Sequence, residues 1–77
     1  MEEGQLSFLL DLESRRLLRE ALPRLPQRQR EALTLRLTRD WKYDRIAQEM
    51  GTSVGSIKAH IFHAIANLTR YIHGGKP

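Results

Sequence analysis

Apolar residues near the end of the chain recur at spacings of three and four positions, the period of one face of an α-helix. We therefore predict a helix that packs this face against a core. Thr52 or Ser53 can cap its start with a side-chain oxygen, and the glycines at 74 and 75 would end it. The apolar positions of this helix are Val54, Ile57, Ile61, Ile65, Leu68 and Ile72.

Three segments upstream show the same helical period. A first helix is predicted over about residues 5–21, where Pro23 stops it, and a second over about residues 27–38, directly after Pro26. The segment "YDRIAQEM" predicts a third, short helix. The residues predicted to face the core in these three helices are Leu6, Leu9, Leu10, Leu17, Ala21, Ala32, Leu33, Leu37, Ile46, Ala47 and Met50.

The last two predicted helices lie very close together along the chain. Gly51 can adopt the left-handed conformation that closes a helix, and three residues later the final helix is already running. A short helix, a tight glycine-containing turn and a longer helix are typical of the helix-turn-helix unit, whose second helix enters the DNA major groove. No segment shows the alternation typical of strands. We predict an all-α fold, a small four-helix domain with a C-terminal helix-turn-helix.

The face of the final helix opposite its apolar stripe is unusual for a solvated surface, because small and apolar residues occupy much of it. Lys58 and Phe62 are one turn apart on its flank. Lys58 can bind phosphate or guanine, Phe62 can contact a thymine methyl group, and His63 can donate to an acceptor. Alternatively, Phe62 packs against the first helix. The residues directly opposite the stripe are Ala59, His63, Ala66 and Arg70.

Length and composition restrict the alternatives. The 77 residues make one domain with a modest core, and the absence of cysteine excludes disulfides and thiolate metal sites. No apolar run approaches the roughly 20 residues that span a bilayer, and the acidic start does not resemble a signal peptide. We therefore expect a soluble, cytoplasmic protein that does not act at a membrane.

Charge is distributed unevenly along the chain, whose formal net charge is +4. Residues 1–14 carry four acidic side chains and no basic one, whereas residues 15–45 carry ten Lys or Arg against four acids. A basic middle of this kind raises the local concentration of polyanions, which favours nucleic acid as partner. An arginine-rich solvated surface is the alternative interpretation.

Catalytic and metal sites are not predicted. His60 and His63 are three positions apart, but the neighbouring sequence lacks the further ligands that zinc requires. The chain has no glycine-rich phosphate loop, no carboxylate pair in a plausible cleft and no serine with a positioned His and Asp. We predict a protein that is not an enzyme and takes no cofactor and no small-molecule substrate.

Three stretches, "LPQRQREALTLR", "YDRIAQEMG" and "SVGSIKAHIFHA", resemble region 4 of bacterial extracytoplasmic-function sigma factors, over about residues 21–72. Region 4 is the C-terminal, promoter-reading domain of these factors. The resemblance implies a four-helix domain that binds the −35 element of double-stranded promoter DNA and the β flap of RNA polymerase. On this interpretation, residues 1–20 form an N-terminal helix or connecting segment, and residues 21–77 form the helix-turn-helix domain.

The resemblance also implies a set of DNA contacts, with the backbone from Ser53 to Ser56 facing phosphate. The predicted contacts also include Arg45 and His60, two positions at which this chain differs from the family. The family commonly has arginine at the positions of His60, His63 and Ile65. It commonly has serine in place of Ala59, an acidic residue in place of Arg45 and a smaller aliphatic residue in place of Trp41. Because histidine is mostly uncharged at pH 7, we expect weak intrinsic DNA affinity and a basic patch shifted toward the third helix. The predicted DNA-binding residues are Arg36, Arg45, Ser53, Ser56, Lys58, Ala59, His60, Phe62 and His63.

Weak affinity is compatible with a sigma domain, because tethering to polymerase supplies a high effective concentration. The promoter-melting domain of the family is absent from these residues, so we expect a domain excised from a longer factor rather than a free-standing relative. A second interpretation is a sigma-like decoy or the target of an anti-sigma factor, suggested by the few arginines on the final helix and by a wide apolar band in the first, at Phe8, Leu9, Leu10 and Leu12. A third is the output domain of a response regulator.

Overall fold

The computed structural model describes the backbone of residues 12–71 and the side chains of residues 15–71. Within this range the chain forms four α-helices, one short 3-10 helix and no strand, which confirms the predicted all-α class. The elements are α2 (Leu12–Ala21), η2 (Leu22–Arg24), α3 (Gln27–Arg39), α4 (Tyr43–Met50) and α5 (Val54–Thr69).

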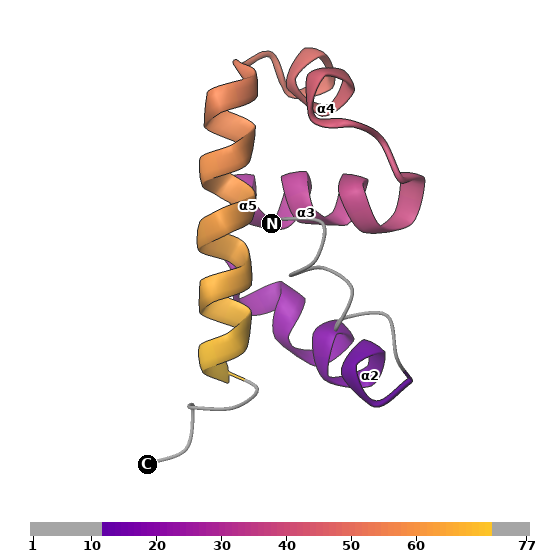
Figure 1. Cartoon of the computed structure of the whole chain (residues 1–77). Coiled ribbons are helices and arrows are strands. Elements are labelled where there is room, and N and C mark those ends of the chain that lie inside the picture. Colours follow the sequence, from indigo (N-terminus) through magenta and orange to yellow (C-terminus); the bar gives the residue numbers. More distant parts are fainter. Residues whose placement is uncertain (1–11, 72–77) are drawn as a thin grey trace.

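Helix α5 is the longest described element, and the other helices are arranged along it (Figure 1). Helix α4 lies beside the N-terminal end of α5, α3 crosses near its middle, and α2 lies toward its C-terminal end. Both α3 and α4 pack against α5. One face of α5 is therefore covered along the helix, and the opposite face is left to solvent.

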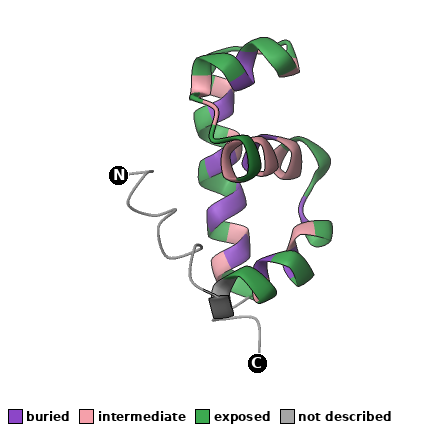
Figure 2. Cartoon of the chain, turned by 90° about the vertical axis from the view of Figure 1, so that its right-hand side faces the viewer, coloured by how far each residue is buried: buried purple, intermediate pink, exposed green. Residues whose placement is uncertain are grey.

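The core contains the predicted stripe of α5. Ile57, Ile61 and Leu68 are fully buried, and Ile65 is 6% exposed. Figure 2 shows buried and exposed segments alternating along this helix. Half-buried Leu37, Met50 and Trp41 pack around the core, which is otherwise formed by Leu18, Ala21, Leu25, Ala32, Leu33, Ile46, Ala47 and Ala64.

The prediction that Val54 belongs to the core is wrong, since this side chain is 38% exposed. Val54 is the first residue of α5 and lies almost one turn before Ile57, where the buried stripe begins. The helical period continues the stripe to Val54, but the packing of the neighbouring helices does not reach it. An apolar side chain is thus presented to solvent at the tip of the helix.

The helix boundaries agree with the predicted stop signals. Helix α3 begins after Pro26 and ends at Arg39, and the next residue, Asp40, has a left-handed backbone with φ of 56°. The α-helical geometry of α5 runs to Thr69 and Arg70 keeps a right-handed helical backbone, whereas the predicted end at the glycines lies outside the described residues. Residues 1–11 and 72–77, with Leu6, Leu9, Leu10 and Ile72, lie outside the described residues, so the predictions made there stay predictions.

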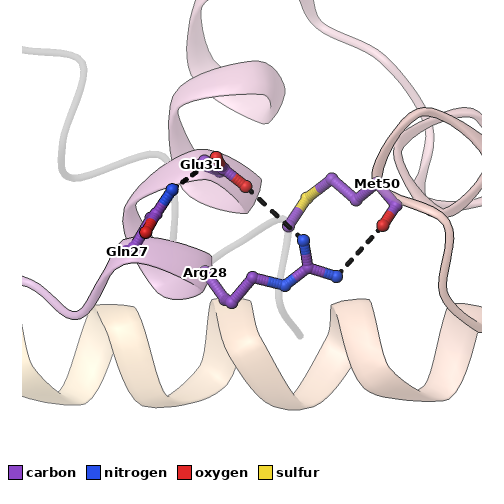
Figure 3. A network of polar contacts seen from close by, with 4 residues as sticks. All are labelled: Gln27, Arg28, Glu31 and Met50. Atoms are coloured by element: carbon purple, nitrogen blue, oxygen red, sulfur yellow. Dashed lines mark hydrogen bonds and ion pairs between the residues drawn. The ribbon is translucent and has the colours of Figure 1, made fainter.

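Polar side chains fix α3 to its neighbours. Arg28 Nη2 donates to the carbonyl oxygen of Met50 (3.0 Å), and Arg28 Nη1 lies 3.7 Å from Glu31 Oε1 (Figure 3). Gln27 Nε2 donates to the other carboxylate oxygen of Glu31 (3.3 Å). Met50 ends α4, so the Arg28 bond holds that end against the start of α3 and places the turn that leads into α5.

A second polar contact joins α3 directly to α5. The amide of Asn67 donates to Gln29 Oε1 (2.9 Å) in a partly buried position.

No helix in the described part of the chain has the length and apolarity that crossing a bilayer requires.

Candidate nucleic-acid interface

The turn between α4 and α5 is closed by backbone hydrogen bonds. Gly51 has φ of 67°, and its N–H donates to the carbonyl of Gln48 (3.3 Å). The N–H of Thr52 donates to the carbonyl of Ala47 (2.9 Å). This pair of bonds is the Schellman motif, which requires a left-handed residue and so favours glycine. The predicted conformation of Gly51 is confirmed.

Ser53 starts α5 directly after this motif. Its Oγ accepts a hydrogen bond from the backbone N–H of Ser56 (3.1 Å), and the two hydroxyl oxygens lie 3.2 Å apart. A serine in this position satisfies one of the backbone donors that the first turn of a helix leaves without an intrahelical acceptor. The remaining donors at a helix start, with their partial positive charge, are the kind of group that binds phosphate. The predicted cap at Ser53 is confirmed.

The solvent-facing side of α5 carries Lys58, Ala59, Phe62 and His63, all of them exposed, and we call these four residues the reading face. The Phe62 ring is 54% exposed, and it contacts His63 edge-on at 5.5 Å between ring centroids. The alternative prediction, in which Phe62 packs against the first helix, does not agree with this exposure. Ala66 and Arg70 are exposed farther along α5, as predicted.

Val54 extends the reading face toward the start of α5. It precedes Lys58 and Phe62 by one and two turns, so the three side chains form one row along the helix. Sequence reasoning missed this because an apolar residue three positions before Ile57 continues the core period equally well. Only the end of the packing surface distinguishes the two placements.

His60 and Ser56 lie at the margin between the core side of α5 and the reading face, and both are half-buried. Within residues 12–71 no group of three or more His, Cys, Asp or Glu side chains is placed to hold a metal ion. The described residues therefore bring His60 and His63 onto one helix without assembling a ligand set around them.

Arg36 has a different environment from the reading face. Its side chain is 10% exposed, and Nη1 donates to Asp40 Oδ1 and to the carbonyl of Trp41, both at 3.1 Å. These bonds connect α3 to the segment before α4, a structural role that the sequence did not indicate. The predicted DNA contact of Arg36 stays a prediction.

The segment between α3 and α4 forms a corner where arginines surround an indole. Cζ of Arg45 lies 4.1 Å from the centroid of the Trp41 ring, and Cζ of Arg39 lies 5.4 Å from it. Both arginines are exposed and Trp41 is half-buried. The sequence singled out Trp41 and Arg45 as departures from the family, but it did not indicate that they touch or that Arg39 joins them.

A family model described as "Sigma-70, region 4" matches residues 15–68, more than half of the chain. The matched range includes the turn at Gly51, the reading face and the corner around Trp41. No curated protein and no solved structure matches the chain. On the family match and the helix-turn-helix geometry, the chain belongs to the region 4 family of sigma-70 factors, a promoter-recognition module of sigma factors.

Proposed function

We propose that this domain binds the −35 element of promoter DNA with α5 in the major groove, and that it also binds the β flap of RNA polymerase. The observation that carries the proposal is the difference in burial between the two sides of α5. Its isoleucines are buried against α3 and α4, whereas the reading face is exposed on the opposite side. A helix of this kind projects a ridge that fits a major groove about 12 Å wide.

Each member of the reading face has a distinct chemical role in this proposal. Lys58 binds a phosphate or the acceptor edge of guanine, and Phe62 contacts a thymine methyl group. Ala59 has no side chain beyond Cβ, so the helix backbone can approach the bases closely. His63 donates a hydrogen bond, with its ring oriented by the edge contact with Phe62. The backbone at Ser53 and Ser56 faces phosphate.

Intrinsic affinity is expected to be modest, because Lys58 is the one lysine or arginine of the reading face. Each phosphate contact contributes to affinity by releasing bound counterions, so few charges mean weak binding. A domain held on polymerase by a second contact does not need strong binding of its own. This is the physical reason for proposing the flap contact together with the DNA contact.

The flap requires a surface that leaves the reading face free. A groove of about 590 Å³ meets this requirement, because none of its lining residues belongs to α5. Apolar Leu35 and Met50 share the groove with charged side chains, which suits a mixed apolar and polar partner. The lining residues are Arg28, Arg30, Glu31, Thr34, Leu35, Glu49 and Met50.

A salt-dependent DNA titration with Lys58→Glu tests the DNA contact. Fluorescence titration of the full chain against a promoter duplex should give affinity that falls as salt rises. Lys58→Glu should weaken binding about tenfold or more, since it replaces a base or phosphate contact by repulsion. Arg24→Glu is the matched control, because it makes the same charge change at an exposed residue of η2, away from the reading face.

Binding without salt dependence, or equal losses in Lys58→Glu and Arg24→Glu, would contradict the DNA contact. A pull-down with the β flap distinguishes a sigma domain from other DNA readers, and Lys58→Glu should leave flap binding intact. A chain that binds the flap or an anti-sigma factor while its DNA binding is insensitive to Lys58→Glu would instead be a protein-interaction module.

A further inference from the structure

The ring of Trp41 contacts two arginine side chains. Arg39 is the last residue of α3, and Arg45 lies in the first turn of α4, so the two come from different helices. Their Cζ atoms lie 5.4 and 4.1 Å from the centroid of the same ring, within the range of a cation–π contact. With Lys42, which is also exposed, these residues form what we call the basic corner: Arg39, Trp41, Lys42 and Arg45.

The arginines of the basic corner differ in their partners from three other arginines of the domain. Arg16, Arg28 and Arg36 each lie within 4.0 Å of a carboxylate, at Glu20, Glu31 and Asp40 respectively. Within residues 12–71, the guanidinium groups of Arg39 and Arg45 form no ion pair with a carboxylate. The acid next to Arg45, Asp44, accepts from the backbone N–H of Arg45 (2.8 Å), and the acid next to Arg39, Asp40, pairs with Arg36. Two like charges are thus held beside one ring without an ion pair of their own to a carboxylate.

Stacking on an aromatic face leaves guanidinium donors available. The face of the ion rests on the ring, whereas the N–H groups point outward in the plane of the guanidinium and match phosphate oxygens. The ring also restricts two long side chains that would otherwise lose rotamer freedom on binding. The arrangement therefore suits a polyanion with closely spaced phosphates better than it suits solvent.

We propose that the basic corner is a second DNA-contact surface that binds backbone phosphates beside the groove occupied by α5, with Trp41 as a positioning residue. The inference rests on the proposed function. In a helix-turn-helix the first helix crosses the DNA backbone, and here α4 lies beside the N-terminal end of α5 (Figure 1). The corner supplies sequence-independent affinity that the weakly charged reading face lacks.

The test is a titration of the full chain against a promoter duplex that extends beyond the −35 element on both sides, repeated over a salt series. The double variant Arg39→Gln with Arg45→Gln should reduce the slope of log affinity against log salt by about 1.8, at about 0.9 for each lost phosphate contact. Trp41→Ala keeps both charges and should weaken binding about twofold to fivefold, as expected for an exposed cation–π contact. Trp41→Phe retains an aromatic face and should restore most of this loss.

The chain offers matched controls at the opposite end of α5. Arg24 Cζ lies 5.7 Å from the centroid of the Tyr71 ring, so this pair repeats the arginine–aromatic contact away from the corner. Arg24→Gln and Tyr71→Ala should leave the salt slope unchanged. Thermal unfolding of every variant shows whether it is folded. Because Arg39 and Arg45 are exposed, their double variant carries the test even where Trp41→Ala fails to fold.

The outcomes separate this inference from the proposed function. Equal changes in the corner and control variants overturn the basic corner as a DNA contact. A loss of flap binding with DNA binding unchanged also overturns it and assigns the corner to a protein partner. If Lys58→Glu abolishes DNA binding while the corner variants bind normally, only the inference about the corner fails. If the corner variants weaken binding and Lys58→Glu does not, the proposed role of α5 fails.

Discussion

His63 is the residue at which the proposed affinity of this domain for DNA can be raised most directly. It lies beside Phe62 on the reading face of α5, which we propose faces the bases. Its ring contacts the edge of Phe62 and is not buried, so a longer side chain can be accommodated there. The position lacks the permanent charge that an arginine would bring to a phosphate or a guanine.

His63→Arg should therefore tighten binding to promoter DNA several-fold at pH 7 and steepen its salt dependence by about 0.9, as one added phosphate contact would. Titration over a salt series measures both quantities. His63→Gln is the control, because it keeps a hydrogen-bond donor without adding charge and should leave the slope unchanged. Unaltered binding by His63→Arg would indicate that this position does not face DNA.

Single residues also show where sequence reasoning ends. The exposure of Lys58 followed from helical periodicity, because a buried stripe on one side of a helix fixes the opposite side. For Phe62 the same periodicity left packing against the first helix open, and the structure resolves this in favour of exposure. The bonds of Arg36 to Asp40 and to the Trp41 carbonyl did not follow, since a long side chain can reach several partners and only the course of the connecting segment selects among them. The contact of Arg39 and Arg45 with one indole ring could not be predicted from the sequence for the same reason.

At the scale of elements, the turn between α4 and α5 determines how the reading face is presented. Gly51 adopts φ of 67°, and a Cβ built there meets no atom within 4 Å. Any cost of a side chain at this position is therefore a backbone cost and not a clash. Gly55, the second residue of α5, has no left-handed φ, and a Cβ there would make an ordinary contact of 3.9 Å with Ser53 Oγ.

Replacing each of these two glycines by alanine should change the free energy of unfolding in opposite directions. Gly51→Ala should lower the free energy of unfolding by about 1–2 kcal/mol, because an L-residue is forced into the left-handed region. Gly55→Ala should raise it by about 0.5–1 kcal/mol, because glycine within a helix loses more backbone entropy on folding than alanine does. Urea denaturation of both variants measures the two values. A stabilising Gly51→Ala would be inconsistent with the Schellman geometry of the turn.

The helices themselves were predictable to within a few residues wherever strong local signals mark their ends. Helix α3 was expected over about residues 27–38 and is observed from Gln27 to Arg39, because Pro26 fixes its start. The end of α5 predicted at the glycines stays a prediction, because residues 72–77 lie outside the described part of the chain. Val54 was assigned to the core because periodicity carries no information on how far the neighbouring helices extend.

For the whole molecule, folding and the proposed DNA contact depend on opposite sides of one helix. Ile61 and Phe62 are neighbours in sequence, yet Ile61 is fully buried and the Phe62 ring is 54% exposed. Because α3 and α4 both pack on α5, the loss of a buried side chain there affects the entire core. A small domain with a single core is expected to unfold in one cooperative step, so the damage should appear in global stability.

The neighbouring pair therefore allows stability and binding to be separated. Ile61→Val should lower the free energy of unfolding by about 0.5–1.5 kcal/mol, and Ile61→Ala by about 2–5 kcal/mol, which is comparable to the whole stability of a small domain. Phe62→Ala should change stability by less than about 0.5 kcal/mol, as exposed positions usually do, but should weaken promoter binding through the lost apolar contact with a base. Urea denaturation and DNA titration of folded Ile61→Val and Phe62→Ala measure the two effects independently. If Phe62→Ala costs as much stability as Ile61→Val while DNA affinity is unchanged, the ring is a packing residue, and the apolar part of the proposed base contact is lost with it.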